Sequence, residues 1–336
     1  MSDDFTLELF QNAVEKHIAH LKEHGTSDEK IANALAHADF SKPFDSVTEQ
    51  MAMDSVSHIE STMYERILEV RAQTAEFLAR NEQLWGKCFV ASETMYTLVL
   101  ETIQAYNNYL KHQPEEYLEE KRYTIEALSK LHGRACQQFL EITYLLKLGF
   151  ADGAYARWRS LYELSIITEF ISDNGEAIAH AYCDAANADN SWYDWAKEYP
   201  KFSKKKHIRF ADIQKECSST TEEWLAHYKL ANRIVHATPN GTFGRLGQPD
   251  NIDENNYICA GHSDYGLACP AVNAAISLCI VTTLYLTVVP YGDGIVALKC
   301  ISKWVDIVEK YYSEVEKTRF NNTDIPRRTR IDGSKI

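Results

Sequence analysis

The sequence lacks the paired cysteines that mark a zinc site or a disulfide framework. Its eight cysteines are scattered over 336 residues and form no CxxC pair. The first residues, MSDDFTLELF, also lack the basic stretch and apolar run that open a secretory signal. Neither a structural zinc site nor a secreted disulfide-rich fold is therefore indicated, and we expect a cytoplasmic protein.

The motifs of several large enzyme classes are absent as well. The chain has no GxxxxGK[ST], no GxGxxG after a strand pattern, no HExxH and no GxSxG. Nucleoside triphosphatases, dinucleotide oxidoreductases, zincins and α/β-hydrolases depend on these motifs. We expect no cofactor. We also expect no metal site, because His180 and Asp184, four residues apart, supply two candidate ligands and not a set.

Positive charge is scarce. The formal net charge of −13 argues against a general electrostatic footprint for nucleic acid. The run Lys204, Lys205 and Lys206 is a local exception, and the segment 317–336 ends in a second basic cluster. Each cluster is typical of a solvated loop or terminus, and the lysine run is also our candidate for contacts to an acidic substrate.

Alternating strand patterns are nearly missing, whereas apolar residues three and four apart recur along the chain. This spacing predicts an all-α fold, a multi-helix bundle with long antiparallel helices. Thr26 and Glu29 match a capping box at the start of a second helix. Pro114 and Gly149 predict two chain breaks, so we divide the chain into helical regions 1–112 and 115–316 and the basic tail 317–336.

The longest apolar run, Pro270 to Pro290, contains no charged residue. It is nearly long enough to span a membrane. Asn273, Ser277 and several threonines are spread along it, and no lysine or arginine flanks it closely. This polar content favours a buried core helix over a membrane segment.

Helical periodicity stops between residues 238 and 268. The segment TPNGTFGRLGQPDNIDENNYICAGHSDYGLA is rich in glycine and poor in periodic apolar positions. Structureless segments of this length in a compact domain are usually functional or mobile. We expect this segment to be the most mobile internal part of the chain.

The stretch ADGAYARWRSLYELSIITEFI, residues 151–171, places Arg157, Arg159 and Glu163 in an otherwise apolar helix. Arg159 and Glu163 are four residues apart and so share a helical face. One interpretation is an ion pair that fixes the helix register. The order of arginine before glutamate is the weaker one for such a pair, which favours an additional partner on another helix.

His236 ends the helical pattern of YKLANRIVH and precedes a chain exit at Thr238–Gly241. A histidine in this place commonly stabilises the end of a helix, because its cation suits the helix dipole. The functional alternative is that His236 opens toward the same cleft as Arg159 and Glu163. There an imidazole could serve as general acid and base on a phosphodiester.

Two segments carry a family resemblance. The helix with Arg159, Leu161 and Glu163, and the later helix that ends in His236, resemble the bacterial family of unknown function numbered 5677, over roughly residues 115–316. The layout is also similar to HEPN ribonucleases, in which an arginine and a histidine cut RNA without metal. Arg233 and His236 take these positions here, at a shorter spacing than those ribonucleases show.

The resemblance implies a metal-independent ribonuclease or RNA-directed toxin-like effector of a bacterial antiviral defence or stress system, with a protein partner from the same system. His236 would be the acid and base, Arg159 and Arg233 would stabilise the phosphorane, and Glu163 would orient a basic group, with Arg157 and the lysine run holding RNA. The alternative is a non-enzymatic helical module that binds a ligand or partner. No membrane association is expected.

Surplus apolar surface predicts self-association. The uncharged run Pro270 to Pro290 needs apolar neighbours on every side, and the long helical segment 46–112 offers further apolar faces that one compact core would leave uncovered. Two-fold symmetry is the commonest way to bury such surface. We therefore expect a homodimer with a mainly helical interface.

Overall fold

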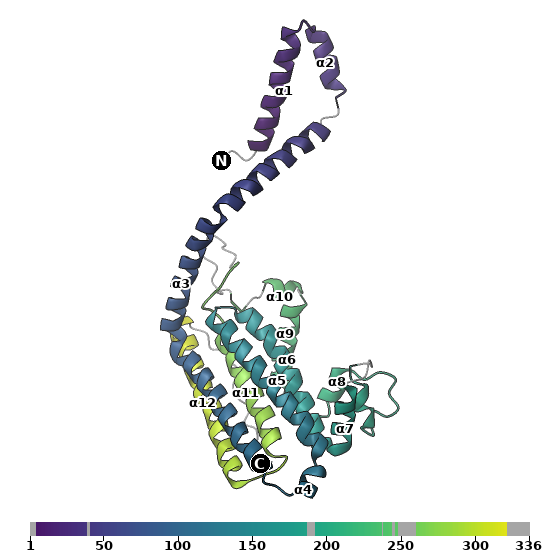
Figure 1. Ribbon diagram of the computed structural model, residues 1–336, viewed down its shortest axis with the longest axis vertical. Coiled ribbons are helices and arrows are strands. Elements are labelled where there is room, and N and C mark those ends of the chain that lie inside the picture. Colours follow the sequence, from purple (N-terminus) through teal and green to yellow (C-terminus); the bar gives the residue numbers. More distant parts are fainter. Residues whose placement is uncertain are drawn as a thin grey trace. The chain divides into compact units, whose positions relative to one another are not determined.

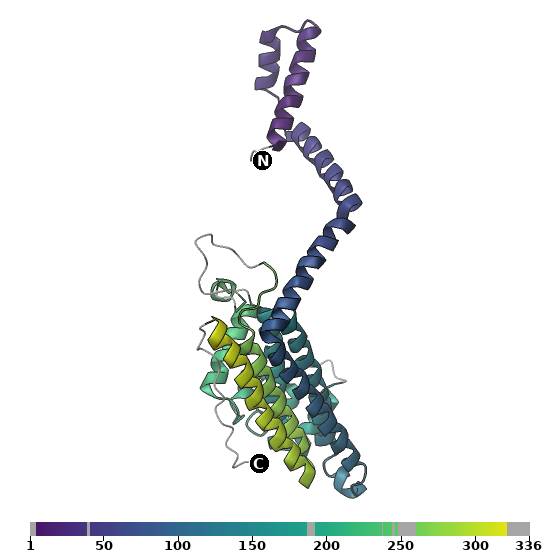
Figure 2. The ribbon, with the colours of Figure 1, turned by 90° about the vertical axis from the view of Figure 1, so that its left-hand side faces the viewer.

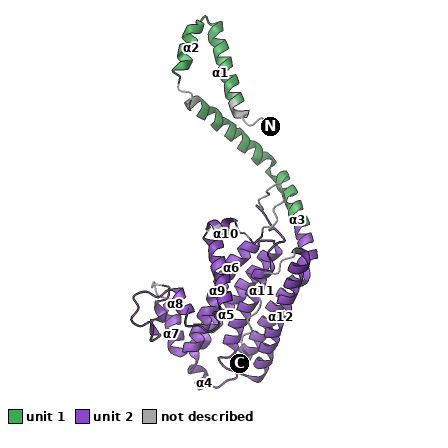
Figure 3. Cartoon of the chain, turned by 180° about the vertical axis from the view of Figure 1, so that it is seen from behind, with its two compact units in different colours: residues 1–76 green, residues 77–336 purple. Residues whose placement is uncertain are grey.

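The structure is a computed structural model that describes residues 5–38, 41–186, 192–236, 238–243, 246–247 and 260–320. Every regular element in these ranges is a helix, which confirms the all-α prediction (Figure 1). The chain divides into two compact units, residues 1–76 and residues 77–336, and one long helix contributes to both (Figure 3).

The first unit contains two short helices and the beginning of a long one. Their bounds are Phe5–Glu23 for α1, Asp28–Ala36 for α2 and Ser41–Leu110 for α3, of which residues 41–76 belong to this unit. The expected capping box of Thr26 and Glu29 is wrong. Ser27, with extended backbone, is the N-cap of α2, and its side chain makes no capping hydrogen bond. The helix therefore starts one residue too late for Thr26 to cap it.

The core of the second unit is a bundle of four long helices and the C-terminal half of α3. The four are α5 (Arg122–Lys147), α6 (Ala151–Asn174), α11 (Ala268–Leu286) and α12 (Gly292–Phe320). They run side by side in both views (Figures 1 and 2). α12 is tied to α3 because the Trp304 indole donates to the Ala91 carbonyl at 2.9 Å and the Tyr312 hydroxyl lies 3.2 Å from Ser92 Oγ.

Helix α11 lies at the centre of this bundle and packs against α5, α6 and α12. In the described part of the chain it is the one helix long and apolar enough to cross a membrane, yet most of it is buried inside the protein. Two of its polar side chains find partners on neighbouring helices. The Trp158 indole donates to Ser277 Oγ at 3.0 Å, and His132 Nε2 lies 3.1 Å from Thr282 Oγ1. The prediction of a buried core helix is therefore confirmed.

Shorter helices surround the bundle. They are α4 (Glu115–Glu119), α7 (Glu176–Ala185), the 3₁₀ helix η1 (Asp194–Glu198), α8 (Phe210–Gln214), α9 (Glu222–Val235) and α10 (Pro239–Phe243). Among them α9 packs on α6. Its N-cap is Thr221, whose hydroxyl accepts a hydrogen bond from the Trp224 N–H at 3.2 Å, as N-cap threonines do.

The segment between the two predicted breaks, residues 115–148, forms two helices. α4 and α5 are separated at Glu120 and Lys121. The cause lies on α7, where the Glu176 carboxylate accepts the N–H groups of Tyr123 at 2.5 Å and Thr124 at 3.0 Å. A carboxylate from another helix thereby accepts backbone N–H groups in the first turn of α5. A new helix can therefore begin at this point.

The two predicted chain breaks, at Pro114 and Gly149, are confirmed. α3 ends before Pro114, and Gly149 separates α5 from α6 with a φ of 77°. Residues 244–245 and 248–259 of the glycine-rich segment that we expect to be mobile lie outside the described residues, as do residues 321–336 of the basic tail.

Gly149 gives a direct test of this packing. A Cβ atom there would lie 2.5 Å from the Phe77 ring and 2.7 Å from the Ser263 carbonyl oxygen, on a backbone with positive φ. Gly149→Ala should therefore lower the free energy of unfolding by about 2 kcal/mol. Gly133→Ala is the control, because nothing lies within 4 Å of that Cβ. It should stabilise the helix by about 0.8 kcal/mol. Urea unfolding of both variants measures the difference, and equal effects would contradict the packing.

Burial of His132 predicts a pH dependence. Desolvation lowers the pKa of His132 from 6.5 to about 4, so the imidazole is neutral in the folded chain. The contribution of neutral His132 to the free energy of unfolding is fully present above pH 6.5. It declines by about 3 kcal/mol in total as the pH falls toward 4. His132→Gln should remove that part of the decline in denaturant unfolding at pH 7, 5.5 and 4. An unchanged pH profile would show that the pKa of His132 is the same in the folded and the unfolded chain.

Candidate functional site

Arg159, Glu163 and Tyr228 form a polar cluster between α6 and α9. Arg159 Nη2 lies 3.1 Å from Glu163 Oε1, and the Tyr228 hydroxyl donates to the same oxygen at 2.7 Å. The Arg159 guanidinium carbon is 5.7 Å from the centre of the Tyr228 ring. The two residues that the sequence places on one helical face are therefore paired, and their additional partner is a tyrosine of another helix.

The cluster is neither sealed nor fully exposed. The side chains of Arg159 and Glu163 are 29% and 25% exposed. Arg159 Nε is buried and has no hydrogen-bond acceptor among the described residues. A buried N–H without an acceptor costs on the order of 1–3 kcal/mol, so this group would gain from an added acceptor.

The electrostatics of the cluster extend to a second tyrosine. Burial, and then the hydrogen bond and charge of Glu163, raise the pKa of Tyr228. Burial and the charge of Glu163 also raise the pKa of Tyr193, while the charge of Arg159 lowers it. Both phenols therefore keep their protons at neutral pH. Tyr193 lies close enough to feel both charges of the pair.

Aromatic rings connect these tyrosines. The Phe210 ring lies 5.5 Å from Tyr228 and 6.4 Å from Tyr193, and Tyr162 lies 5.0 Å from Tyr228. Trp192, next to Tyr193 in the chain, is 87% exposed. The guanidinium thus lies beside a partly exposed group of aromatic side chains drawn from α6, α8, α9 and the residues before η1.

His236 lies at the other end of α9. It is the C-cap residue of that helix and is exposed, with its N–H donating to the Asn232 carbonyl at 3.0 Å. Eight residues separate it from Tyr228, which corresponds to about 12 Å of helical rise. Arg233 is exposed in the same last turn. The structure therefore brings Arg159 and Glu163 together. It places His236 at the C-terminal end of α9, which is the first of the two interpretations that the sequence allows.

The candidate substrate-binding cations have different surroundings. Arg157 Nε is paired with the Glu141 carboxylate on α5. Lys205 Nζ is paired with Asp212 at 2.8 Å. Lys204 and Lys206 are exposed in the loop before α8. Two of the four thus have acidic partners within the chain.

A second cluster, which the sequence did not indicate, joins three helices. The Tyr155 hydroxyl lies 2.7 Å from His227 Nδ1, and Cys269 Sγ lies 3.7 Å from the same nitrogen. Burial raises the pKa of Tyr155, lowers that of His227 and raises that of Cys269 to about 12. The thiol and phenol stay protonated and the imidazole neutral, so this is a satisfied core network without an activated nucleophile. The sequence separations of 42 and 72 residues left no local signal for it.

No group of three or more potential metal ligands occurs in the described ranges. His180 Nε2 lies 3.3 Å from Asp184 and its ring stacks on Tyr123, 3.9 Å between centres. Both residues of the pair are exposed. This pair therefore stays a two-residue contact.

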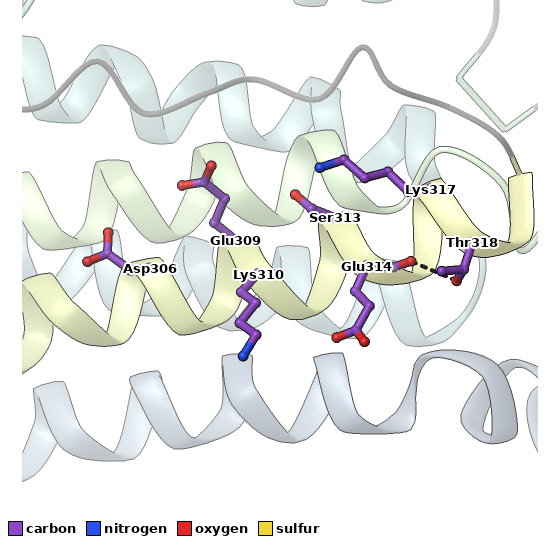
Figure 4. Close-up of a pocket in the computed structure, with 7 residues that line it drawn as sticks. All are labelled: Asp306, Glu309, Lys310, Ser313, Glu314, Lys317 and Thr318. Atoms are coloured by element: carbon purple, nitrogen blue, oxygen red, sulfur yellow. Dashed lines mark hydrogen bonds between the residues drawn. The ribbon is translucent and has the colours of Figure 1, made fainter.

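A shallow groove follows the surface of α12 (Figure 4). Its lining residues are Asp306, Glu309, Lys310, Ser313, Glu314, Lys317 and Thr318. Lys310 and Glu314 point to one side of the helix, whereas Glu309, Ser313 and Lys317 point to the other (Figure 4). Each side thus carries both signs of charge, and the three acidic and two basic lining residues leave a net charge of only −1.

One family model matches part of the chain. Residues 125–255 match the model of a family described as Family of unknown function (DUF5677). The match begins in α5 and includes Arg159, Glu163, Tyr228 and His236. No curated protein matches the chain, and no solved structure matches it. The resemblance to this family is therefore confirmed over the part of the chain that carries the cluster.

A double-mutant cycle tests the cluster. Arg159→Gln and Glu163→Gln should show a coupling of about 1 kcal/mol in urea unfolding, because the pair is largely desolvated and shares an oxygen with Tyr228. Glu126 and Lys130 are a control pair with the same spacing, 4.0 Å apart and 47% and 74% exposed. Their coupling should not exceed about 0.5 kcal/mol. Equal couplings would mean that the Arg159 pair behaves as a surface pair.

Proposed function

We propose that the chain is a non-enzymatic ligand-binding module, and that Arg159 with its surrounding tyrosines binds a ligand that carries an anionic group beside an aromatic ring, as nucleotides do. One observation carries the proposal. Arg159 is partly exposed beside a group of aromatic side chains, and its buried Nε–H lacks an acceptor among the described residues.

The chemistry of the guanidinium supports an anionic ligand. Arginine presents a rigid fork of donors that matches carboxylate and phosphate oxygens, and charge-assisted hydrogen bonds of this kind are about twice as strong as neutral ones. Glu163 holds one side of the fork through Nη2. A fixed guanidinium loses less side-chain entropy when a ligand binds, so the ion pair would prepare the site.

The neighbouring rings support an aromatic part of the ligand. Tyr193 and Tyr228 are partly buried, so part of each ring is open to a ligand. Stacking of a base on an aromatic side chain is worth about 1–3 kcal/mol.

The ribonuclease hypothesis has less support. A general acid and base must come within hydrogen-bond reach of the proton that it transfers. His236 lies about 12 Å of helical rise beyond Tyr228. His227 is closer, but its Nδ1 is bound by Tyr155 and burial lowers its pKa. Ligand binding at Arg159 needs no imidazole beside the arginine, whereas RNA cleavage by the proposed mechanism needs one as general acid and base.

Ligand titrations test the proposal. Adenosine, guanosine, cytidine and uridine 5′-monophosphates are the probes, inorganic phosphate is the ring-free control, and tryptophan fluorescence and thermal shift are the readouts. At least one nucleotide should bind more tightly than phosphate, and Arg159→Gln should weaken its binding about 10-fold or more. Arg157→Gln is the matched control, because it breaks a comparable partly buried ion pair with Glu141 and leaves the cluster intact.

Two results would contradict the proposal. Equal binding by wild-type and Arg159→Gln chains would place the ligand elsewhere. Metal-independent RNA cleavage by the wild type, lost in His236→Ala, would support the ribonuclease hypothesis instead. We expect the wild-type and His236→Ala chains to degrade RNA equally little in the presence of a chelator.

A further inference from the structure

Helix α3 carries an exposed apolar stripe in the first unit. It consists of Val56, Ile59, Met63, Ile67 and Val70, which are 62%, 49%, 56%, 45% and 54% exposed. At 3.6 residues per turn, these five side chains fall within a band about 80° wide. The spacing of three, four, four and three residues keeps all five on one face, as in a helix that packs against a second helix along its length.

The same helical face is buried where α3 continues into the second unit. In the second unit, Asn81, Trp85, Cys88 and Val99 continue the 3.6-residue repeat of the stripe in the sequence, and all four are at most 1% exposed. Asn81 and Val99 follow Met63 at intervals of 18 residues, which is five full turns. The face is thus suited to burial along the whole helix, and in residues 56–70 it is uncovered.

The residue types of the stripe are arranged symmetrically about Met63. Ile59 and Ile67 lie four residues to either side, and Val56 and Val70 lie seven residues to either side. Matching residue types at matching distances are expected of a helix that pairs with an antiparallel copy of itself, since a two-fold axis at Met63 then sets isoleucine against isoleucine and valine against valine. We propose that this stripe is a homodimer interface, formed with the same stripe of a second, antiparallel copy of the chain.

A membrane surface fits the stripe less well. Helices that lie on acidic lipid headgroups carry lysine and arginine on their polar face. Residues 53–76 contain five acidic and two basic residues. A net negative flank would be repelled by such headgroups, so a second protein helix is the better occupant.

Sedimentation equilibrium of the full chain, from about 1 to about 100 µM, tests the proposal. The wild type should reach twice the 38.4 kDa mass of the single chain. Met63→Lys sets two cations against each other at the two-fold axis and should raise the dimer dissociation constant about 100-fold or more. Leu68→Lys is the matched control. Leu68 is 48% exposed on the same helix but lies outside the stripe, so this variant should dimerise like the wild type.

Disulfide trapping tests the direction of the pair. Val56→Cys and Val70→Cys chains, mixed and oxidised, should form a disulfide with each other, and neither should form one alone above the wild-type background of native thiols. A monomeric wild type at about 100 µM, or a dimer that survives Met63→Lys, would overturn the proposal. Disulfides within Val56→Cys alone would overturn the antiparallel direction. Far-UV circular dichroism checks that each variant keeps its helix content.

Discussion

Helix α11 carries no charged side chain and is buried along nearly its whole length, and this burial governs how its neighbours are arranged. A helix without a solvated face needs packing partners on every side, which α5, α6 and α12 provide. Its buried polar groups also need hydrogen bonds. Ser277 therefore meets the indole of Trp158, and Thr282 meets His132. These two contacts fix the rotation of α6 and α5 about their own axes.

The rotation of α6 explains why the two arginines of this helix have different partners. Trp158 faces α11, and successive residues leave a helix about 100° apart. Arg157 and Arg159 therefore leave α6 on opposite flanks of Trp158. Arg157 meets Glu141 of α5, whereas Arg159 meets Glu163 and the Tyr228 ring of α9. The guanidinium of the candidate site is thus placed by the packing of the core, one residue away.

Local patterns in the sequence were sufficient for much of this arrangement. The burial of α11 follows from its composition, the break at Gly149 from a residue that tolerates positive φ, and the pairing of Arg159 with Glu163 from their spacing. Contacts between distant segments were not accessible in this way. Nothing near residue 159 points to Tyr193 or Tyr228, because tyrosine occurs 19 times in the chain and has no fixed spacing to its partners.

Local sequence patterns also fail to predict a helix start or end that depends on a contact with another helix. The interruption between α4 and α5 depends on Glu176, more than 50 residues further along the chain. His236 had two interpretations, helix cap and catalytic base, because a single helix pattern cannot say what faces its last turn. The structure puts it at the C-cap and puts Tyr228, two turns earlier, at the arginine.

The two proposals depend on different consequences of burial. The Arg159 guanidinium is partly buried, and its Nε–H has no hydrogen-bond acceptor among the described residues. A ligand would supply that acceptor. On α3 an apolar face that is covered in residues 81–99 stays exposed in residues 56–70, so a second copy would remove apolar surface from water. The two sets of residues have no member in common. Each chain of a dimer would therefore keep its own complete arginine cluster, and ligand binding at that cluster does not require the dimer.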